Sequence, residues 1–422
     1  MYEATRRALA LIGALGLATL SGCAGSGGMS GGGGTGTTVT ASFTGATMPS
    51  GVAYQVGTGK FQQLTVSGAS ASFTVPSGSS AYGFAYVCPT FAAGNSYSNE
   101  TIIQATTTDT TSLSMACPSL SGSVNATFDV SAIPGATSVL LYVNYWSAQY
   151  YATSGSVGLS GIPTGTFDVA LVADGANGTL AIQIQRGVTI TGSAATIAFP
   201  PMTAADELGS APASITNVPS GTTAGFEPIY NTSGGLSVIL DGPFNGVPQS
   251  TYRTVPSSQS QPGDFYVLQG GANLTGQSVF AQMSSSTASA ITMALPSPLS
   301  SVTAPMAAAF PTFTANTSGF TVAGPVVNSS WTQFSNSNVV YNTYTFVTKN
   351  WLGAGSTFTV PDLSALSGFT PAPPSGVREF WSLYSTAGTP LQFNSLQQSA
   401  PELLTSPVSL QQVTTSGYFE VP

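Results

Sequence analysis

Apolar and polar residues alternate along most of the chain with a period of two, which is typical of half-buried β-strands. The alternation is clearest at residues 38–43, 71–75 and 82–87, where Thr, Val, Tyr and Phe dominate. Clusters of Gly, Pro, Ser and Asn interrupt these runs about every 8–12 residues, the spacing expected for β-sandwiches or barrels. We therefore predict an all-β fold of antiparallel sheets.

One β-hairpin is nearly explicit in the sequence. Residues 166–172 and 179–184 read as its strands, and Asp174-Gly175 and Asn177-Gly178 lie between them. Such pairs supply the positive φ angles that tight hairpin turns require. Outside the strands, we expect at most one short helix, near residues 202–208.

A loose internal repeat divides the chain into units. At residues 73–78, 161–169 and 255–267 an apolar residue and Pro end one strand, Gly turns, and an aromatic residue opens the next strand. Units of about 80–100 residues follow, a size typical of small sandwich domains. We place three of them at residues 38–118, 119–202 and 203–300. A last unit at 301–422 follows, and the boundary between it and the third unit lies within the Pro-rich segment 296–311.

Two resemblances sharpen this fold prediction. The repeat is similar to the corner before the penultimate strand of Ig-like sandwiches. In the last unit, Trp331, residues 341–347 and the Pro361-Asp362-Leu363 segment resemble a fibronectin type III module. Both resemblances imply tandem antiparallel β-sandwiches, and such modules bring a fold rather than a fixed function.

The N-terminus has the layout of an export signal. Arg6 and Arg7 precede an apolar run at residues 8–20, which is shorter than the about 20 residues of a membrane-spanning helix. The run ends in Leu20-Ser21-Gly22-Cys23, which resembles the lipobox of bacterial lipoproteins. The resemblance implies a signal peptide at 1–22, lipid such as palmitate on Cys23, and a membrane anchor in the cell envelope facing outside the cytoplasm. The alternative is an ordinary secretory signal with a chance cysteine.

The segment after this cysteine carries few side chains that a core could bury. Residues 23–37 consist mostly of Gly, Ser and Thr. A Gly-rich tether of this length reaches about 20 Å on average. We expect it to separate the folded units from the lipid surface.

The other two cysteines, Cys88 and Cys117, form an even pair in a chain predicted to be exported. Such a pair predicts a disulfide. A bridge closing this loop would contribute roughly 3–4 kcal/mol in the chain-entropy view. Two free buried thiols are the alternative.

The charge content excludes several classes of protein. Only 5% of residues are charged, seven of them are basic, and the chain has no His. Seven basic residues cannot neutralise a nucleic-acid backbone, and the lack of His excludes Ser-His-Asp triads and histidine-ligated zinc. No motif for a cofactor, metal or catalytic centre is present, so we predict no cofactor and no enzyme. The low charge predicts weak dependence of folding on pH and makes self-association plausible.

One aromatic segment, residues 141–151, is the candidate ligand-binding feature. If it is one strand, Tyr142, Asn144 and Trp146 share one face, and Val143 and Tyr145 share the other. Exposed aromatic rings beside an amide would suit a glycan or a protein partner. In the alternative, Trp146 is covered by a loop or a neighbouring unit.

The sequence therefore predicts a lipid-anchored envelope protein with a structural or adhesive role, which presents β-sandwich modules to protein partners or matrix. A carbohydrate-binding or substrate-capturing lipoprotein that uses Tyr142 and Trp146 is the alternative. An envelope hydrolase is the third reading, because the scattered carboxylates could still supply an acid pair.

Overall fold

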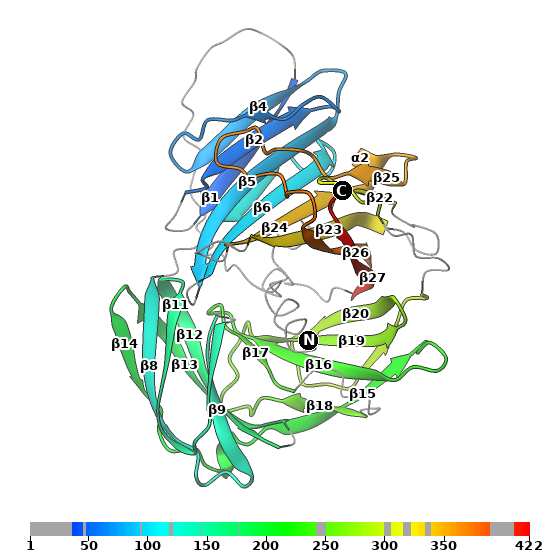
Figure 1. Cartoon of the computed structure of the whole chain (residues 1–422). Coiled ribbons are helices and arrows are strands. Elements are labelled where there is room, and N and C mark those ends of the chain that lie inside the picture. The colour runs from blue at the N-terminus through cyan, green and yellow to red at the C-terminus, as the bar shows by residue number, and fades with distance from the viewer. Residues whose placement is uncertain are drawn as a thin grey trace.

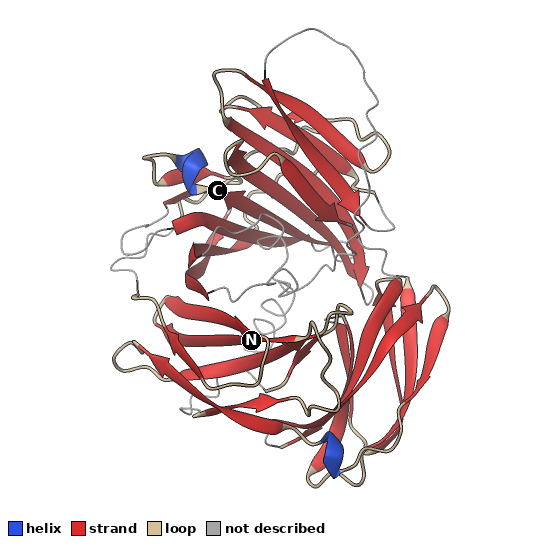
Figure 2. Cartoon of the chain, turned by 180° about the vertical axis from the view of Figure 1, so that it is seen from behind, coloured by secondary structure: helices blue, strands red, loops and turns tan. Residues whose placement is uncertain are grey.

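The computed structural model describes most of the chain after the predicted tether. The described residues are 36–44, 48–92, 95–117, 121–144, 146–176, 178–241, 250–298, 305–314, 322–333, 339–388 and 409–422. Strands dominate, as the alternation predicted, and two short helices are present among these residues (Figure 2). The fold is all-β and consists of tandem antiparallel β-sandwiches.

The first unit is a sandwich with seven strands. They are β1 (Gly36–Thr44), β2 (Gly51–Val56), β3 (Gln62–Gln63), β4 (Ser70–Pro76), β5 (Ala81–Ala92), β6 (Asn95–Thr106) and β7 (Ser112–Ala116). The sheet β4-β1-β7 packs over β2, β5 and β6. Its core includes Val39, Phe73, Phe84 and Ile103, which are buried because alternate side chains of each strand point inward.

The second unit packs one sheet of four strands against one of three. Its strands are β8 (Gly122–Asp129), β9 (Ala136–Val143), β10 (Trp146–Tyr150), β11 (Ser154–Ile162), β12 (Gly165–Gly175), β13 (Gly178–Ile190) and β14 (Ala194–Ala198). The sheets have the orders β10-β9-β12-β13 and β11-β8-β14. The predicted hairpin is confirmed as β12 and β13, which pair from Gly165 with Ile190 to Gly175 with Gly178.

The third unit begins with the predicted short helix. It is the 3-10 helix η1 (Ala204–Asp206), closed by a capping box between Thr203 and Asp206. The strands that follow are β15 (Gly209–Thr216), β16 (Ala224–Asn231), β17 (Ser237–Ile239), β18 (Thr251–Thr254), β19 (Phe265–Leu274), β20 (Gln277–Ser285) and β21 (Ile291–Ala294). Phe226, Tyr230, Tyr252 and Leu268 fill the core of this unit.

The last segment supplies six strands and a helical turn. They are β22 (Thr312–Thr314), β23 (Val322–Gln333), β24 (Val339–Val347), α2 (Lys349–Leu352), β25 (Thr357–Thr359), β26 (Arg378–Gly388) and β27 (Ser409–Glu420). Trp381 and Leu383 of β26 pack with Phe313 and Phe358, and this cluster includes Ile102 of the first unit. The core of the last segment is therefore continuous with one face of the first unit.

One sheet of twelve strands crosses the molecule, in the order β17-β16-β19-β20-β27-β26-β23-β24-β6-β5-β2-β3. Four strands of the last segment, β27, β26, β23 and β24, lie in it between β20 of the third unit and β6 of the first (Figure 1), and β22 and β25 form a separate pair. β24 pairs with β6 in parallel, from Val339 with Ser96 to Val347 with Gln104. The last segment therefore joins the first and third units through backbone hydrogen bonds rather than through side chains alone.

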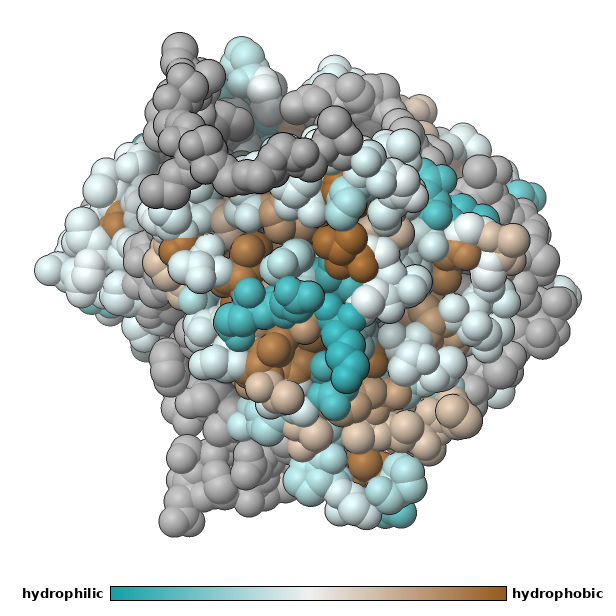
Figure 3. Space-filling model, turned by 90° about the horizontal axis from the view of Figure 1, so that it is seen from above, coloured by the Kyte–Doolittle hydropathy of each residue, from teal (hydrophilic) through white to brown (hydrophobic). Residues whose placement is uncertain are grey.

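The surface reflects the low charge content. Most residues visible from above are pale in the hydropathy colouring, and strongly hydrophilic residues are confined to a few places (Figure 3). Such a surface depends on Ser, Thr, Asn, Gln and Gly for its contacts with water, because only 5% of residues are charged.

Candidate functional site

The predicted disulfide pair is joined in the structure. Cys88 lies on β5 and Cys117 follows β7, with their Cα atoms 5.4 Å apart. Since β5 and β7 belong to opposite sheets of the first unit, the bridge connects the two layers across the core. Cys23, the predicted lipidation site, lies outside the described residues.

The candidate ligand-binding residues do not form one exposed strand face. β9 ends at Val143, Asn144 takes a left-handed conformation with φ of 56°, and β10 begins at Trp146, which pairs back with Val143. The expected strand through this segment is therefore a hairpin. Asn tolerates positive φ better than most residues, which explains why the turn forms without Gly.

Burial also removes these residues from the surface. Tyr142 is 7% exposed and Asn144 1% exposed. Tyr142 packs in the core of the third unit, together with Ala170 of β12, because the third unit covers the outer face of the β9 sheet. Trp146 is half-buried against the core of the second unit. This position of Trp146 corresponds to the covered arrangement that we considered as the alternative.

The exposed aromatic residues of this region lie slightly later in the sequence. Tyr150 is 45% exposed and Tyr151 79% exposed. The ring of Tyr150 packs edge-on against Phe128, at 6.0 Å between centroids. The Tyr151 hydroxyl donates a hydrogen bond to Oε1 of Gln149, at 3.1 Å.

Arg186 forms the centre of a polar junction between the second and third units. It lies on β13 at a β-bulge, where Asp168 of β12 interrupts the regular pairing. The bulge turns the guanidinium group toward the third unit. Nη1 donates to Oδ2 of Asp168 at 2.9 Å, and Nη2 donates to Oδ2 of Asp264 at 2.7 Å and to the carbonyl of Gln259 at 2.6 Å.

Asp264 accepts several further hydrogen bonds. Its carboxylate accepts from the hydroxyl of Tyr230 at 2.6 Å and from the backbone N–H groups of Ser233 and Gln261 at 3.0 and 2.8 Å. Burial by itself raises the pKa of Asp264, but Arg186 and these hydrogen bonds outweigh it, so the pKa lies below its usual value. The arrangement holds two carboxylates and one guanidinium in fixed, paired positions and links the second unit to the third.

A second network continues the same junction. Nε2 of Gln259 donates to Oδ1 of Asp206 at 3.3 Å, and Nε2 of Gln183 donates to Oδ2 of the same carboxylate at 3.2 Å. The backbone N–H of Ile184 donates to Oε1 of Gln259 at 2.9 Å. The loop between β18 and β19 is therefore docked on β13 through side chains that are themselves fixed.

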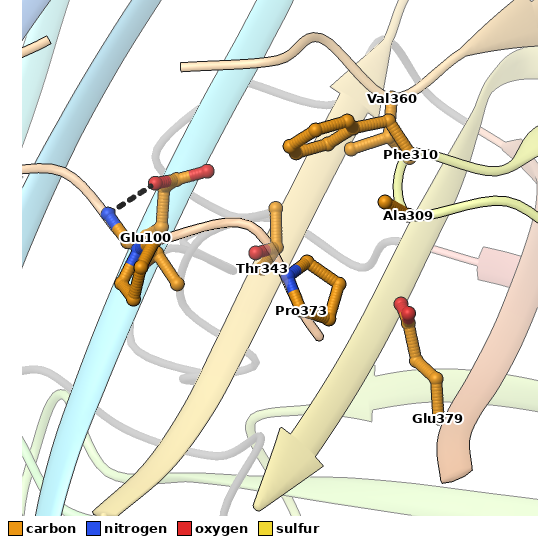
Figure 4. Close-up of a pocket in the computed structure, with 9 residues that line it drawn as sticks. Glu100, Ala309, Phe310, Thr343, Val360, Pro373 and Glu379 are labelled. Carbon is orange, nitrogen blue, oxygen red and sulfur yellow. Dashed lines mark hydrogen bonds between the residues drawn. The ribbon is translucent and has the colours of Figure 1, made fainter. Parts of the chain in front are cut away.

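Two buried carboxyl groups line a small cavity beneath the last segment (Figure 4). Glu100 of β6 is 4% exposed, and Glu379 of β26 is 2% exposed. Figure 4 shows Thr343 and Pro373 between them. The cavity measures about 20 Å³, which is room for about one water molecule. A space of this size does not admit a sugar ring or a peptide.

The environment of Glu100 favours its neutral form. Burial raises the pKa of this carboxyl to about 7, although the backbone N–H of Thr370 donates a hydrogen bond to Oε2 at 3.1 Å and partly opposes the rise. Sequence reasoning did not single out Glu100 or Glu379, because each is a single acid within a Ser- and Thr-rich strand. Only their burial distinguishes them.

Among the described residues, no group of three or more His, Cys, Asp or Glu side chains is arranged to hold a metal ion. Within the same residues, no helix has the length and apolar character needed to cross a membrane.

Comparison with known proteins adds nothing to the all-β fold class, which the structure itself shows. No protein-family model matches the chain, and no curated protein matches it. One solved structure, a DUF3823 family protein from Bacteroides ovatus ATCC 8483, is 15% identical over 36% of this chain and 90% of that chain. Its TM-score of 0.11 is too low for any argument about shared structure or function.

Proposed function

We propose that this chain is an exported, lipid-anchored protein of the bacterial cell envelope with a structural or adhesive role. It presents β-sandwich modules of Ig-like and fibronectin-III-like type to protein partners or matrix. The Leu20-Ser21-Gly22-Cys23 segment supports the lipid anchor, and the tether at 23–37 would hold the units away from the membrane surface.

The observation that carries the structural role is the sheet of twelve strands. It unites strands of the first and third units with those of the last segment. The Arg186 junction fixes the second unit against the third through paired charges. Units joined in these two ways cannot reorient independently of one another. A rigid array of this kind suits a protein that displays a surface to a partner.

Two further observations support the location. The disulfide between Cys88 and Cys117 is typical of proteins that fold in an oxidising compartment. Cleavage before Cys23 would remove Arg6, Arg7 and Glu3 and leave a distinctly acidic chain. Such a chain is weakly repelled by anionic lipids, so the lipid on the cysteine would supply the attachment.

Metabolic labelling with palmitate in a bacterial host tests the anchor. We expect the wild type to incorporate label and to fractionate with membranes, and we expect Cys23→Ser to do neither. The Cys88→Ser/Cys117→Ser double variant is the matched control, since it removes cysteines of the same chain that should carry no lipid. Equal labelling of wild type and Cys23→Ser would refute the anchor.

Attachment assays test the role. Cells that display the wild type should bind to surfaces coated with extracellular matrix or partner cells more strongly than cells that express Cys23→Ser. We propose that this role is not catalytic, and the water-sized space between Glu100 and Glu379 supports that view. Hydrolysis of an envelope polymer that is abolished by Glu379→Gln would contradict it.

A further inference from the structure

Four side chains at one end of the β26–β27 pair form a surface that the core does not use. Arg378 lies directly opposite Glu420, and Phe380 directly opposite Tyr418. We call these four residues the Arg378 platform. The residues that alternate with them on β26 are buried, as Glu379 at 2% exposure shows. The platform is therefore the outer face of strands whose inner face is already packed.

The apolar part of the platform is aromatic. Tyr418 is 57% exposed, and its ring lies 5.1 Å from that of Phe380 between centroids. An open hollow of about 400 Å³ beside it is lined by Arg378, Tyr418, Phe419 and Glu420. The hollow is shallow and open to solvent, so a ligand bound there would lie on the surface and keep one side exposed.

The polar part is a donor beside an acceptor. The guanidinium carbon of Arg378 lies 4.1 Å from the centroid of the Tyr418 ring. This cation–π contact holds the guanidinium group over the ring, and a guanidinium group carries five N–H donors. Glu420, opposite it across the strands, offers carboxylate oxygens as acceptors. Together the two side chains carry no net charge.

We propose that the Arg378 platform binds a neutral glycan. A sugar ring has an apolar C–H face that suits the exposed Tyr418 ring, and its hydroxyl groups both donate and accept, which matches Glu420 and Arg378 in turn. An anionic ligand would be attracted by Arg378 and repelled by Glu420, and it would also face a chain with a net charge of −8. This inference depends on the proposed envelope location in one respect only: the protein must lie outside the cytoplasm to meet glycans.

Affinity electrophoresis of the full-length purified chain in detergent tests the proposal. The gels contain one of three neutral polysaccharides (dextran, galactomannan or xyloglucan) or the anionic polygalacturonate. We expect at least one neutral polymer to retard the wild type. Tyr418→Ala should weaken that binding by about tenfold or more, which is the scale of an aromatic residue central to a binding surface. Arg378→Ala should have an effect of similar size, and Tyr418→Phe should retain most binding because the ring remains.

Tyr151→Ala is the matched control, since it removes an even more exposed tyrosine from another unit. Its binding should equal that of the wild type. Equal loss in Tyr418→Ala and Tyr151→Ala, retardation by polygalacturonate alone, or no retardation by any neutral polymer would overturn the proposal. So would a dimer of the wild type that Tyr418→Ala dissociates while no glycan binds. A chain that is lipid-anchored yet binds no neutral glycan would refute this inference alone.

Discussion

Arg186 and Asp264 join two units of the chain through a nearly buried ion pair. Nη2 of the arginine lies 2.7 Å from Oδ2 of the aspartate, and their side chains are 19% and 1% exposed. Asp168 of the second unit shares the same guanidinium group at 2.9 Å. Because each carboxylate is largely removed from water, loss of the arginine would leave two buried negative charges without their cation.

Replacement of Arg186 should therefore destabilise the protein strongly. We expect Arg186→Ala to lower the free energy of unfolding by about 3 kcal/mol or more, as is typical when one partner of a buried ion pair is removed. The urea midpoint, followed by circular dichroism, measures the effect. Lys60→Ala removes the same charge from an exposed position and should change stability by less than about 0.5 kcal/mol. Similar midpoints for the two variants would show that the junction contributes little.

Acidification from neutral pH should increase stability. Burial raises the pKa of Glu100 and of Glu227 to about 7, from the ordinary value of 4.5. Between these values the folded chain binds more protons than the unfolded chain, so the free energy of unfolding rises as the pH falls from about 7 toward 4.5. Each group can contribute roughly 3 kcal/mol over that range. This dependence differs from the weak pH response that the composition alone suggested.

Urea midpoints at pH 7.5 and pH 5 measure this effect. Glu100→Gln and Glu227→Gln should each reduce the difference between the two midpoints, because the neutral amide has no proton to lose. Glu207→Gln, at an exposed carboxyl, should leave the difference unchanged. A wild-type midpoint that is lower at pH 5 than at pH 7.5 would contradict the expected sign.

The disulfide of the first unit should contribute substantially to stability. Cys88 and Cys117 close a loop with a sequence separation of 29 residues. We expect Cys88→Ala/Cys117→Ala to lower the free energy of unfolding by about 3–4 kcal/mol. Reductant should destabilise the wild type and leave the variant unaffected. Mass spectrometry of unreduced peptides provides the direct check, and two free thiols in the purified wild type would disprove the bridge.

Alanine substitutions at two glycines distinguish the cost of backbone strain from the cost of a steric overlap. Gly368 and Gly376 have φ angles of +82° and +80°, so alanine is strained at either position. A Cβ atom at Gly368 would also overlap the backbone carbonyl of Ser50 in the first unit, whereas nothing lies within 4 Å of such an atom at Gly376. Gly376→Ala should cost about 1–2 kcal/mol, and Gly368→Ala should cost about 1–3 kcal/mol more. Thermal melting of both variants compares them, and equal losses would exclude the close contact.

The local elements of the fold could be predicted because they depend on neighbours in sequence. Alternating side chains identified strands such as β4, in which Ala71, Phe73 and Val75 are buried and the residues that follow each of them are exposed. Asp174-Gly175 marked the β12–β13 hairpin correctly. By contrast, the turn at Asn144 was missed, because the surrounding aromatic and β-branched residues favour a continuous strand and no Gly or Pro marks the break.

Interactions between distant segments could not be predicted in this way. Nothing local in residues 339–347 indicates parallel pairing with β6, since the same alternation would fit many partners. Asp168, Arg186 and Asp264 are isolated charges in sequence. The bulge on β12 and β13 places Asp168 beside Arg186, and docking of the loop between β18 and β19 adds Asp264. Tyr142 illustrates the same limit. Its side chain lies on the face of β9 that points away from the core of the second unit, and it is buried because the third unit covers that face.

The position of β24 and β27 within the sheet has a consequence for biogenesis. Asn342 donates a side-chain hydrogen bond to Asn99 at 3.0 Å, although the two residues are 243 positions apart. A chain that is synthesised and translocated from its N-terminus would expose the edges of β6 and β20 until the last strands emerge. Unpaired edges of this kind promote aggregation. Final assembly would thus be a late event, and truncation before β24 would leave unpaired the edges of β6 and β20, which β24 and β27 cover in the full-length protein.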